Sequence, residues 1–280
     1  MKFGIISRDE IELVSHGLFQ NFRFALKNYL QVDFKNVNNV QDLDSVDTLF
    51  IVDEHFGPHV DIWKNESFIN ELNNRNIRTI IFNFEKIYDA LFPWNVDHQR
   101  NVDRIENLVQ FVSDINDAKI LNRPVINKQL LSRDTVLVQL ENKINEILFI
   151  GQINPHVYVR RREVLGNLMG KNLPLKIINS DRKFTYNEYL KLLASYKYIL
   201  NPLGTGDFLN LRFYEALKMG CVPVQQVTDD MLIRYTELNN GYTVNFKHPN
   251  ELTELPTLES KPFHYYLEDY FEEINLKSYL

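Results

Sequence analysis

The sequence predicts an α/β protein of two β/α domains, each with a parallel sheet, that face a central cleft. Short apolar runs rich in β-branched and aromatic residues alternate with longer amphipathic stretches, which is typical of parallel strands joined by crossover helices. This pattern lapses in a polar stretch over 128–145 and then restarts. The length of 280 residues also suits two domains of roughly 100–200 residues each.

The elements of the first half follow one another at short intervals. Apolar runs of strand length predict strands at 2–7, 32–37, 47–53, 78–84 and 108–113. The amphipathic segments between them predict helices at 15–30, 65–76 and 114–122. We therefore expect an N-terminal domain over residues 1–140.

The second half repeats this plan after the polar stretch. Strands are expected at 147–150, 175–179, 198–201 and 222–225. Helices are expected at 159–171, 185–195 and 208–219. These elements predict a second domain over 146–258. A helical stripe of apolar residues at 264–276 predicts that a C-terminal segment, 262–280, packs back on the first domain.

The charge is unevenly distributed along the chain. The formal charge is −6, from 31 Lys and Arg against 37 Asp and Glu. Residues 151–200 hold 9 basic and 3 acidic side chains, whereas the segments before and after this stretch are both acidic. An acidic protein is not expected to bind nucleic acid, but a local basic segment suits a small anion such as a diphosphate.

The chain carries few signals for a particular compartment. Cys221 is its single cysteine, which excludes an intramolecular disulfide and a multi-cysteine zinc site. The N-terminus becomes polar at Arg8, too early for a signal peptide, and no apolar run reaches the roughly 18–20 residues of a membrane span. We therefore expect a soluble, cytoplasmic protein.

Several common enzyme motifs are absent from the sequence. It has no Gly-x-Gly-x-x-Gly after the first predicted strand, no P-loop, no Gly-x-Ser-x-Gly and no His-Glu-x-x-His. Asp42-Leu43-Asp44 has the Asp-x-Asp form of a metal–diphosphate motif, but it lies in a polar stretch before a strand. We therefore expect no metal site and no cofactor.

The segment 198–224 is the most informative. A strand is expected to end at Asn201, and the loop Gly204-Thr205-Gly206 then allows a ligand to approach the backbone closely. Asp207 is expected to begin a helix whose N-terminal amides face the cleft as an anion site. Arg212 and Glu215 lie three residues apart on one face of that helix, where they can bind phosphate and sugar hydroxyls respectively.

At these residues the chain resembles the exostosin-like glycosyltransferases and, more widely, the GT-B fold of two Rossmann-like domains. The matching motifs are Pro202-x-Gly204, Arg212-x-x-Glu215-Ala216-Leu217 and Gly220-Cys221-Val222-Pro223-Val224. The resemblance implies that Glu215 holds the nucleotide ribose and that Arg212 contacts the diphosphate. Asp207 and Glu215 also have the spacing of the acid-x7-Glu pair of many GT-B enzymes, in which the first acid contacts the donor sugar.

The resemblance extends to the start of the second domain. It implies that the diphosphate lies against Gly151, with Arg161 and Arg162 at the family's arginine position. Asn179 and Ser180, with Phe184 and Tyr186, follow the next strand, where the family holds the base. The implied donor-binding residues are Gly151, Arg161, Arg162, Ser180, Gly204, Thr205, Gly206, Asp207, Arg212 and Glu215.

A base that takes the proton of the acceptor hydroxyl is expected from the first domain, at the carboxyl end of a strand. Asp53 or Glu54 is the first choice, because they follow the most apolar strand of that domain. His16 is a further candidate. Asp9-Glu10 and Glu85 occupy equivalent places after other strands.

These features predict a glycosyltransferase that moves one sugar from a UDP-sugar, such as UDP-xylose or UDP-glucose, to a hydroxyl of a glycan or glycoprotein. The exostosin likeness implies inversion, and no metal is expected. Exostosins usually carry a membrane anchor, so the chain resembles a stand-alone enzyme of bacterial or viral type. The alternatives are a UDP-sugar epimerase of the same fold, an inactive glycan- or nucleotide-binding module, and a DNA-glycosylating enzyme, which the acidic first domain disfavours.

Overall fold

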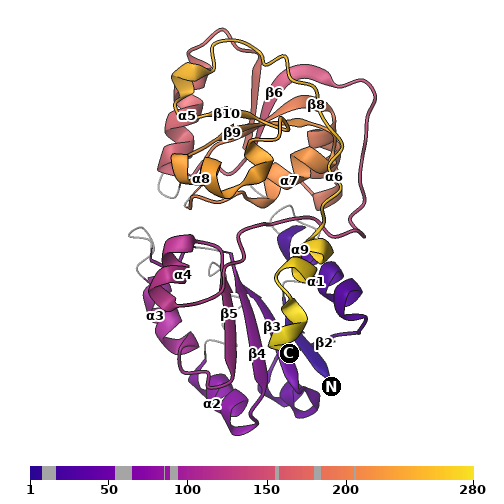
Figure 1. Ribbon diagram of the computed structural model, residues 1–280, viewed down its shortest axis with the longest axis vertical. Helices are drawn as coiled ribbons and strands as arrows, with labels where there is room; N and C mark the ends of the chain where they lie inside the picture. The colour runs from indigo at the N-terminus through magenta and orange to yellow at the C-terminus, as the bar shows by residue number, and fades with distance from the viewer. Residues whose placement is uncertain are drawn as a thin grey trace.

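The computed structural model describes residues 1–7, 17–53, 65–84, 86–88, 94–154, 158–179, 184–204 and 206–280, with the backbone alone at 53 and 94. Figure 1 shows two α/β domains stacked along the long axis of the molecule. Each domain contains one five-stranded sheet.

The sheet of the first domain is parallel, in the order β2-β1-β3-β4-β5. The strands are β1 (Phe3–Ile6), β2 (Lys35–Asn36), β3 (Thr48–Asp53), β4 (Arg78–Asn83) and β5 (Leu108–Val112). Phe50 of β3 and Phe82 of β4 are fully buried, and their rings lie 6.3 Å apart. Strands with such continuous apolar runs are typical of a parallel sheet covered on both faces.

Helices follow the strands of this sheet. They are α1 (Gly17–Leu30), the 3-10 helix η2 (Val40–Ser45), α2 (Glu66–Asn74), α3 (Trp94–Val102) and α4 (Ile115–Leu121). α1 buries Phe19, Phe22 and Leu26, whose spacing places them on one helical face. Asn65 and Asp114 begin α2 and α4 as N-caps, since their side chains accept from backbone amides of the first turn.

The second domain has a parallel sheet in the order β10-β9-β8-β6-β7. Its strands are β6 (Ile144–Gly151), β7 (Leu175–Asn179), β8 (Tyr196–Asn201), β9 (Val222–Gln226) and β10 (Val244–Phe246). The helices are α5 (Val159–Met169), α6 (Tyr186–Ala194), α7 (Leu211–Lys218), α8 (Asp229–Arg234), and the 3-10 helices η4 (Thr236–Leu238) and η5 (Pro249–Glu251). Because β6 and β8 are neighbours, their carboxyl ends lie side by side.

The predicted fold class, an α/β chain of two Rossmann-like domains, is confirmed by this topology. The sequence prediction missed α3, α8 and β10 and overestimated β2, which is only Lys35–Asn36. α3 was missed because polar side chains point into the core. Gln99 of α3 is buried and exchanges two hydrogen bonds of 2.9 Å with the Gln110 side chain.

The C-terminal segment returns to the first domain (Figure 1). It consists of α9 (Leu267–Glu273) and the 3-10 helix η6 (Leu276–Tyr279). The Phe271 ring lies 5.6 Å from the ring of Phe22 and 5.7 Å from that of Tyr29, both on α1. Arg78 Nε donates to the backbone oxygen of Tyr279 (3.0 Å). The chain therefore crosses between the domains twice.

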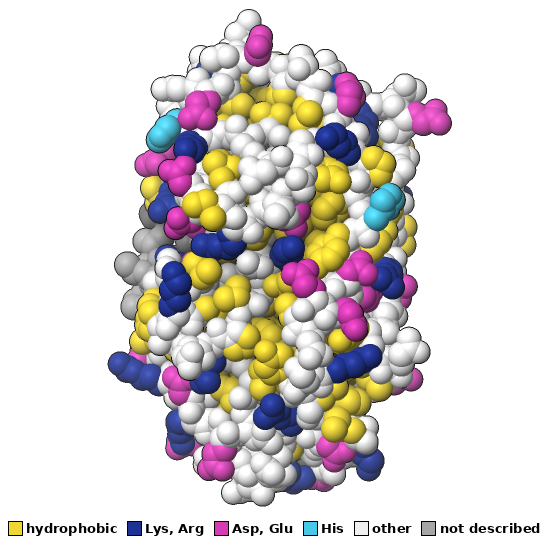
Figure 2. Space-filling view, viewed as in Figure 1, with side chains coloured by type: hydrophobic (Ala, Val, Ile, Leu, Met, Phe, Trp, Pro, Cys, Tyr) yellow, Lys and Arg dark blue, Asp and Glu magenta, His cyan; other side chains and the backbone are white. Residues whose placement is uncertain are grey.

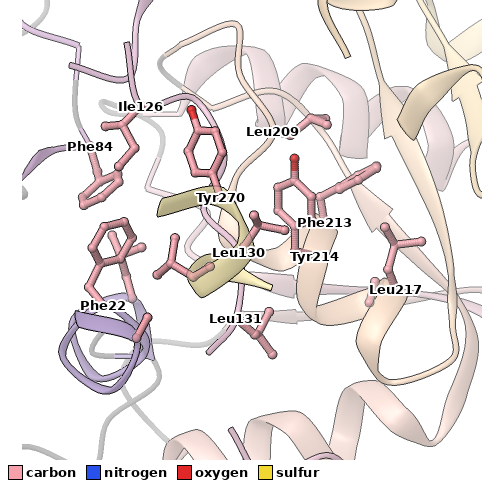
Figure 3. Packing of buried hydrophobic residues seen from close by; sticks show 14 of the residues in the cluster. Phe22, Phe84, Ile126, Leu130, Leu131, Leu209, Phe213, Tyr214, Leu217 and Tyr270 are labelled. Atoms are coloured by element: carbon pink, nitrogen blue, oxygen red, sulfur yellow. The ribbon is translucent and has the colours of Figure 1, made fainter. Parts of the chain in front are cut away.

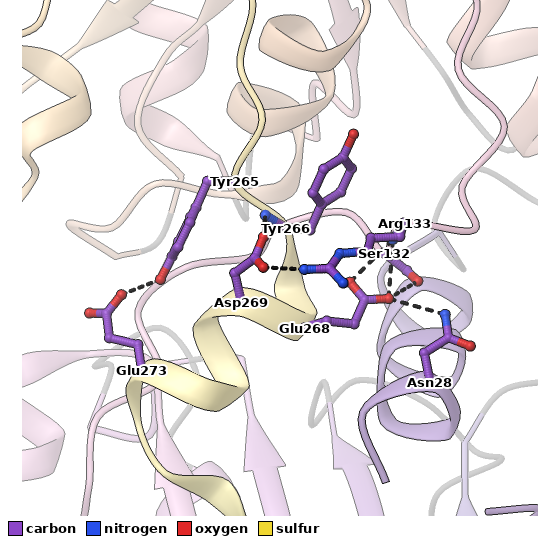
Figure 4. A network of polar contacts seen from close by, with 8 residues as sticks. All are labelled: Asn28, Ser132, Arg133, Tyr265, Tyr266, Glu268, Asp269 and Glu273. Carbon is purple, nitrogen blue, oxygen red and sulfur yellow. Dashed lines mark hydrogen bonds and ion pairs between the residues drawn. The ribbon is translucent and has the colours of Figure 1, made fainter. Parts of the chain in front are cut away.

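A buried carboxylate fixes the start of α9 (Figure 4). Glu268, which is 5% exposed, accepts hydrogen bonds from Ser132 Oγ (2.6 Å), the Arg133 amide (3.1 Å) and Asn28 Nδ2 (3.2 Å). The adjacent Asp269 forms an ion pair with the Arg133 guanidinium. This network joins the C-terminal segment, α1 and the interdomain linker, residues 122–143 between α4 and β6.

The apolar core is continuous between the domains (Figure 3). This cluster contains Phe22 and Phe84 of the first domain and Phe213 and Tyr214 of the second. Tyr270 of α9 lies between these two groups in Figure 3. The two domains are thus packed through side chains from both sheets and from the C-terminal helix.

Candidate functional site

The candidate site is built at the carboxyl ends of β6 and β8. β6 ends at Gly151 and β8 ends at Asn201. The Asn201 side chain donates to Gln225 Oε1 (2.6 Å), and Gln226 Oε1 accepts from the amide of Leu203 (3.0 Å). These contacts tie the loop after β8 to the neighbouring strand β9.

Arg212 reaches this point from the first turn of α7. Its Nη1 donates to Asn201 Oδ1 (3.2 Å), and its guanidinium lies 5.4 Å from the centre of the buried Phe149 ring. Gly151 leaves room for it, since a Cβ there would lie 2.5 Å from Arg212 Nη2. Arg212 Nε is buried and makes no hydrogen bond within the described part of the chain. Asn201 and the Phe149 ring therefore hold the Arg212 guanidinium against the ends of β6 and β8.

Arg161 reaches the same aromatic ring from the first turn of α5. Its guanidinium lies 5.9 Å from the ring centre of Phe149 and 4.0 Å from that of Tyr158, and Arg161 is only 6% exposed. Its Nη1 donates to the Gln152 oxygen (2.8 Å). A Cβ on Gly204 would lie 3.6 Å from Arg161 Nη2. Two guanidiniums, Arg161 and Arg212, thus converge on the ends of two adjacent strands, an arrangement suited to a compact anion.

The loop after β8 is held by two further arginines. Arg160 forms an ion pair with the Asp207 carboxylate (3.3 Å), in which the Arg160 side chain is largely exposed and that of Asp207 is partly exposed. Arg234 of α8 donates to the Asp207 backbone oxygen (3.3 Å). Gly206 is buried where a Cβ would lie 2.5 Å from the Phe208 ring. The position of Asp207 is therefore defined from both its side chain and its backbone.

The structure corrects the predicted start of the helix after this loop. Asp207 does not begin it; α7 starts at Leu211, and Asn210 is the N-cap, whose side chain accepts from the Phe213 amide (3.3 Å). The Leu211 amide donates to Gln129 Oε1 of the linker (2.8 Å). The amides of Leu211 and Phe213 thus already have partners, whereas the Arg161 and Arg212 side chains bring positive charge to this region.

Glu215 lies one turn after Arg212 and is only 2% exposed. Tyr189 of α6 donates its hydroxyl to Glu215 Oε2 (2.8 Å). Burial raises the pKa of Glu215 from 4.5 to about 7, although hydrogen bonds from Tyr189 and Tyr186 and the charge of Arg212 lower it. This carboxylate therefore titrates near neutral pH, and it lies beside the arginine that faces the strand ends.

Other predicted residues lie elsewhere or outside the described chain. Arg162 is exposed on α5, and the structure does not bring it to the Arg161–Arg212 pair. Asp53 ends β3 beside Asn83 of β4, and its side chain is not among those described. Further candidates lie outside the described residues: Asp9, Glu10, His16, Glu54, Glu85, Ser180 and Thr205.

Tyr186 does not fit the expected contact with a nucleotide base. Its ring is stacked on that of Tyr189, with centroids 6.2 Å apart, and a Cβ on Gly17 would lie 2.4 Å from it. Tyr186 is 6% exposed and therefore lies inside the domain junction. Asn179 is exposed at the end of β7, and Phe184 is half-buried.

The Asp-x-Asp sequence has a structural role in η2. Asp42 accepts from the amides of Asn38 (2.9 Å) and Asn39 (3.2 Å), while Asp44 pairs with Arg75 (2.6 Å). Across the part of the chain that the structure describes, no group of three or more His, Cys, Asp or Glu side chains is arranged to hold a metal ion. Among the same residues, no helix is long and apolar enough to span a membrane.

Sequence reasoning missed two contributors to the site. The contribution of Tyr189 could have been predicted from the sequence, because Tyr189 lies three residues after Tyr186 and therefore on the same helical face. The contribution of Arg234 could not, since its contact with Asp207 depends on how α8 packs. Charged side chains of both signs are interspersed over the face in Figure 2, and no single basic patch covers it.

No protein-family model and no curated protein matches the chain. Among solved structures, the chain is similar to an alpha1,3-fucosyltransferase, with 13% identity, coverage of 100% of this chain and 89% of the other, and a TM-score of 0.47. It is also similar to the E. coli ADP-heptose LPS heptosyltransferase II, with 9% identity, coverage of 99% and 98%, and a TM-score of 0.35. The exostosin-like resemblance therefore stays a prediction from the motifs.

Proposed function

We propose that this protein is an exostosin-like glycosyltransferase that moves one sugar from a UDP-sugar to a hydroxyl of a glycan acceptor, with inversion and without a metal. The observation that carries the proposal is the convergence of Arg161 and Arg212 on the ends of β6 and β8. A diphosphate concentrates negative charge in a small volume, which two guanidiniums can bind through several hydrogen bonds each.

The remaining donor contacts follow from the position of the diphosphate. A Cβ on Gly151 would lie 2.5 Å from Arg212 Nη2, and one on Gly204 would lie 3.6 Å from Arg161 Nη2, so the two glycines let both guanidiniums lie against the backbone where the diphosphate would bind. Glu215 would accept the ribose hydroxyls, and Asp207 would contact the transferred sugar. The choice of uridine, and of xylose or glucose as the sugar, rests on the resemblance to exostosin-like enzymes.

The transfer step needs a proton acceptor and a stabilised leaving group. The acceptor oxygen attacks the anomeric carbon, the bond from that carbon to the diphosphate oxygen breaks, and a base of the first domain takes the hydroxyl proton. Asp53 or Glu54 remains the first candidate for this base. Arg161 and Arg212 would stabilise the negative charge that develops on the departing UDP.

A transfer assay tests the proposal. The protein is incubated with UDP-xylose, UDP-glucose, or the corresponding GDP- and ADP-sugars, with and without a glycan array, and nucleotide release and product mass are measured. The proposal predicts acceptor-dependent release of UDP, lost in Arg212→Met. Interconversion of the sugar without an acceptor would indicate an epimerase, and nucleotide binding without turnover would indicate a binding module.

A further inference from the structure

The carboxylate of Glu215 is surrounded by two tyrosines of α6. Tyr189 donates to Oε2 at 2.8 Å, and Tyr186 lies within hydrogen-bonding reach of the same carboxylate. The two tyrosines are three residues apart, so both face α7. Thr185 fixes the start of α6 through a capping box with Glu188, which sets the direction of this face.

Tyr186 is itself held from the first domain. Asn21 of α1 donates its Nδ2 to the Tyr186 hydroxyl (3.1 Å) and to the Gly17 oxygen (2.6 Å). Asn21 Oδ1 accepts from the Ser132 amide (3.0 Å) and from the hydroxyl of Thr135. The first domain and the linker therefore both contribute to the position of the Tyr186 hydroxyl.

We propose that Tyr189 and Tyr186 are positioning residues for Glu215, holding its carboxylate in the orientation that accepts the ribose hydroxyls of the donor. This inference rests on the proposed function. A buried carboxylate has about four lone-pair sites, so it can accept from phenols and still accept from two ribose hydroxyls. The phenols oppose rotation of the carboxylate and favour its ionised form, which is the stronger acceptor.

The charged and titratable groups around Glu215 allow a specific test. They are Tyr189 and Tyr186 on α6 and Arg212 on its own helix. Removing one phenol hydroxyl takes away a hydrogen bond that lowers the pKa of Glu215. Tyr189→Phe should therefore raise the pKa of Glu215 further. Tyr189 also interacts with Arg212, so the Glu215 pKa is measured beside the UDP affinity.

The experiment measures UDP affinity by calorimetry from about pH 6 to pH 9 and the Glu215 pKa by carbon-13 NMR, with the resonance assigned in Glu215→Gln. We expect Tyr189→Phe to bind UDP about five- to tenfold more weakly at neutral pH and to recover at higher pH, with Tyr186→Phe changing in the same direction. Tyr214→Phe is the matched control, because Tyr214 is a buried tyrosine whose hydroxyl faces another carboxylate, Glu237 (3.5 Å).

The outcomes separate this inference from the proposed function. A wild-type protein that binds UDP, together with a Tyr189→Phe variant of unchanged affinity and unchanged pH profile, would overturn the positioning role alone. A raised pKa of Glu215 without any loss of UDP affinity would also overturn it, because the tyrosine would then be structural. A wild-type protein that binds none of UDP, GDP and ADP would refute the proposed function and the positioning role with it.

Discussion

The buried carboxylate of Glu215 should make the protein less stable as the pH rises. Its pKa is raised from 4.5 to about 7, chiefly by burial. Between these pH values the folded state binds more protons than the unfolded state, so the free energy of unfolding decreases with increasing pH. The contribution of this group is therefore fully present below about pH 4.5 and is lost as the pH rises through about 7.

The size of the effect follows from the same shift. One pKa unit corresponds to about 1.4 kcal/mol, so ionising Glu215 in the folded protein lowers the free energy of unfolding by about 3 kcal/mol in total. Roughly 2–3 kcal/mol of this should be lost between about pH 5 and pH 8. Glu215→Gln cannot ionise, and its amide oxygen can still accept from Tyr189. The variant should therefore gain stability relative to the wild type by that amount as the pH rises.

Urea denaturation of both proteins at about pH 5, 6, 7 and 8 measures this difference, and the other titrating groups cancel in the comparison. Glu237→Gln is the matched control, since Glu237 is also buried but lies outside the candidate site. A stability difference between Glu215→Gln and wild type that is equal at pH 5 and pH 8 would contradict a raised pKa of Glu215. It would mean that Glu215 is already ionised in the folded protein throughout this range.

Three further predictions concern the arginine pair. Gly151→Ala should weaken UDP binding at least about tenfold with little loss of stability, because its Cβ would displace the flexible end of Arg212. Gly166→Ala is the control, since no atom lies within 4 Å of the added Cβ. This control variant should gain about 1 kcal/mol of stability. Arg161→Ala should abolish measurable UDP binding in calorimetry, whereas Arg162→Ala on the exposed face of α5 should change it less than about twofold. Turnover should persist in EDTA, because in the proposed mechanism Arg161 and Arg212, and no metal ion, stabilise the charge of the leaving diphosphate.

Three results would contradict these predictions. Wild-type UDP affinity in Gly151→Ala would mean that Arg212 does not contact the diphosphate. A larger loss in Arg162→Ala than in Arg161→Ala would move the anion site to the outer face of α5. Loss of turnover in EDTA, restored by manganese, would show that a metal ion takes part in the reaction.

The order of strands and helices was largely predictable because the strands of a parallel sheet carry near-continuous apolar runs. Phe50 and Phe82 belong to such runs, and both are fully buried. α3 was not predictable in this way, since its core-facing Gln99 is satisfied only by the side chain of Gln110 on β5. Polar pairs of this kind have no local signal in the sequence.

The site was predictable where it depends on one helix and not where it depends on packing. Arg212 and Glu215 lie on one helical face, and the structure brings both to one region. The start of α7 was misjudged because Asp207 and Asn210 are both good N-caps, and only the fold decides between them. The contact between Asn21 and Tyr186 joins residues 165 positions apart and depends on the domain arrangement.

In the proposed function, the Arg161–Arg212 pair binds the diphosphate of a nucleotide-sugar donor. Calorimetric titration of UDP and of uridine into the wild-type protein and Arg212→Met measures this contact. We predict that the wild type binds UDP at least about tenfold more tightly than uridine and that Arg212→Met loses this preference while uridine binding is unchanged. Equal affinity of the wild type for UDP and uridine, or a preference for UDP that persists in Arg212→Met, would contradict the claim.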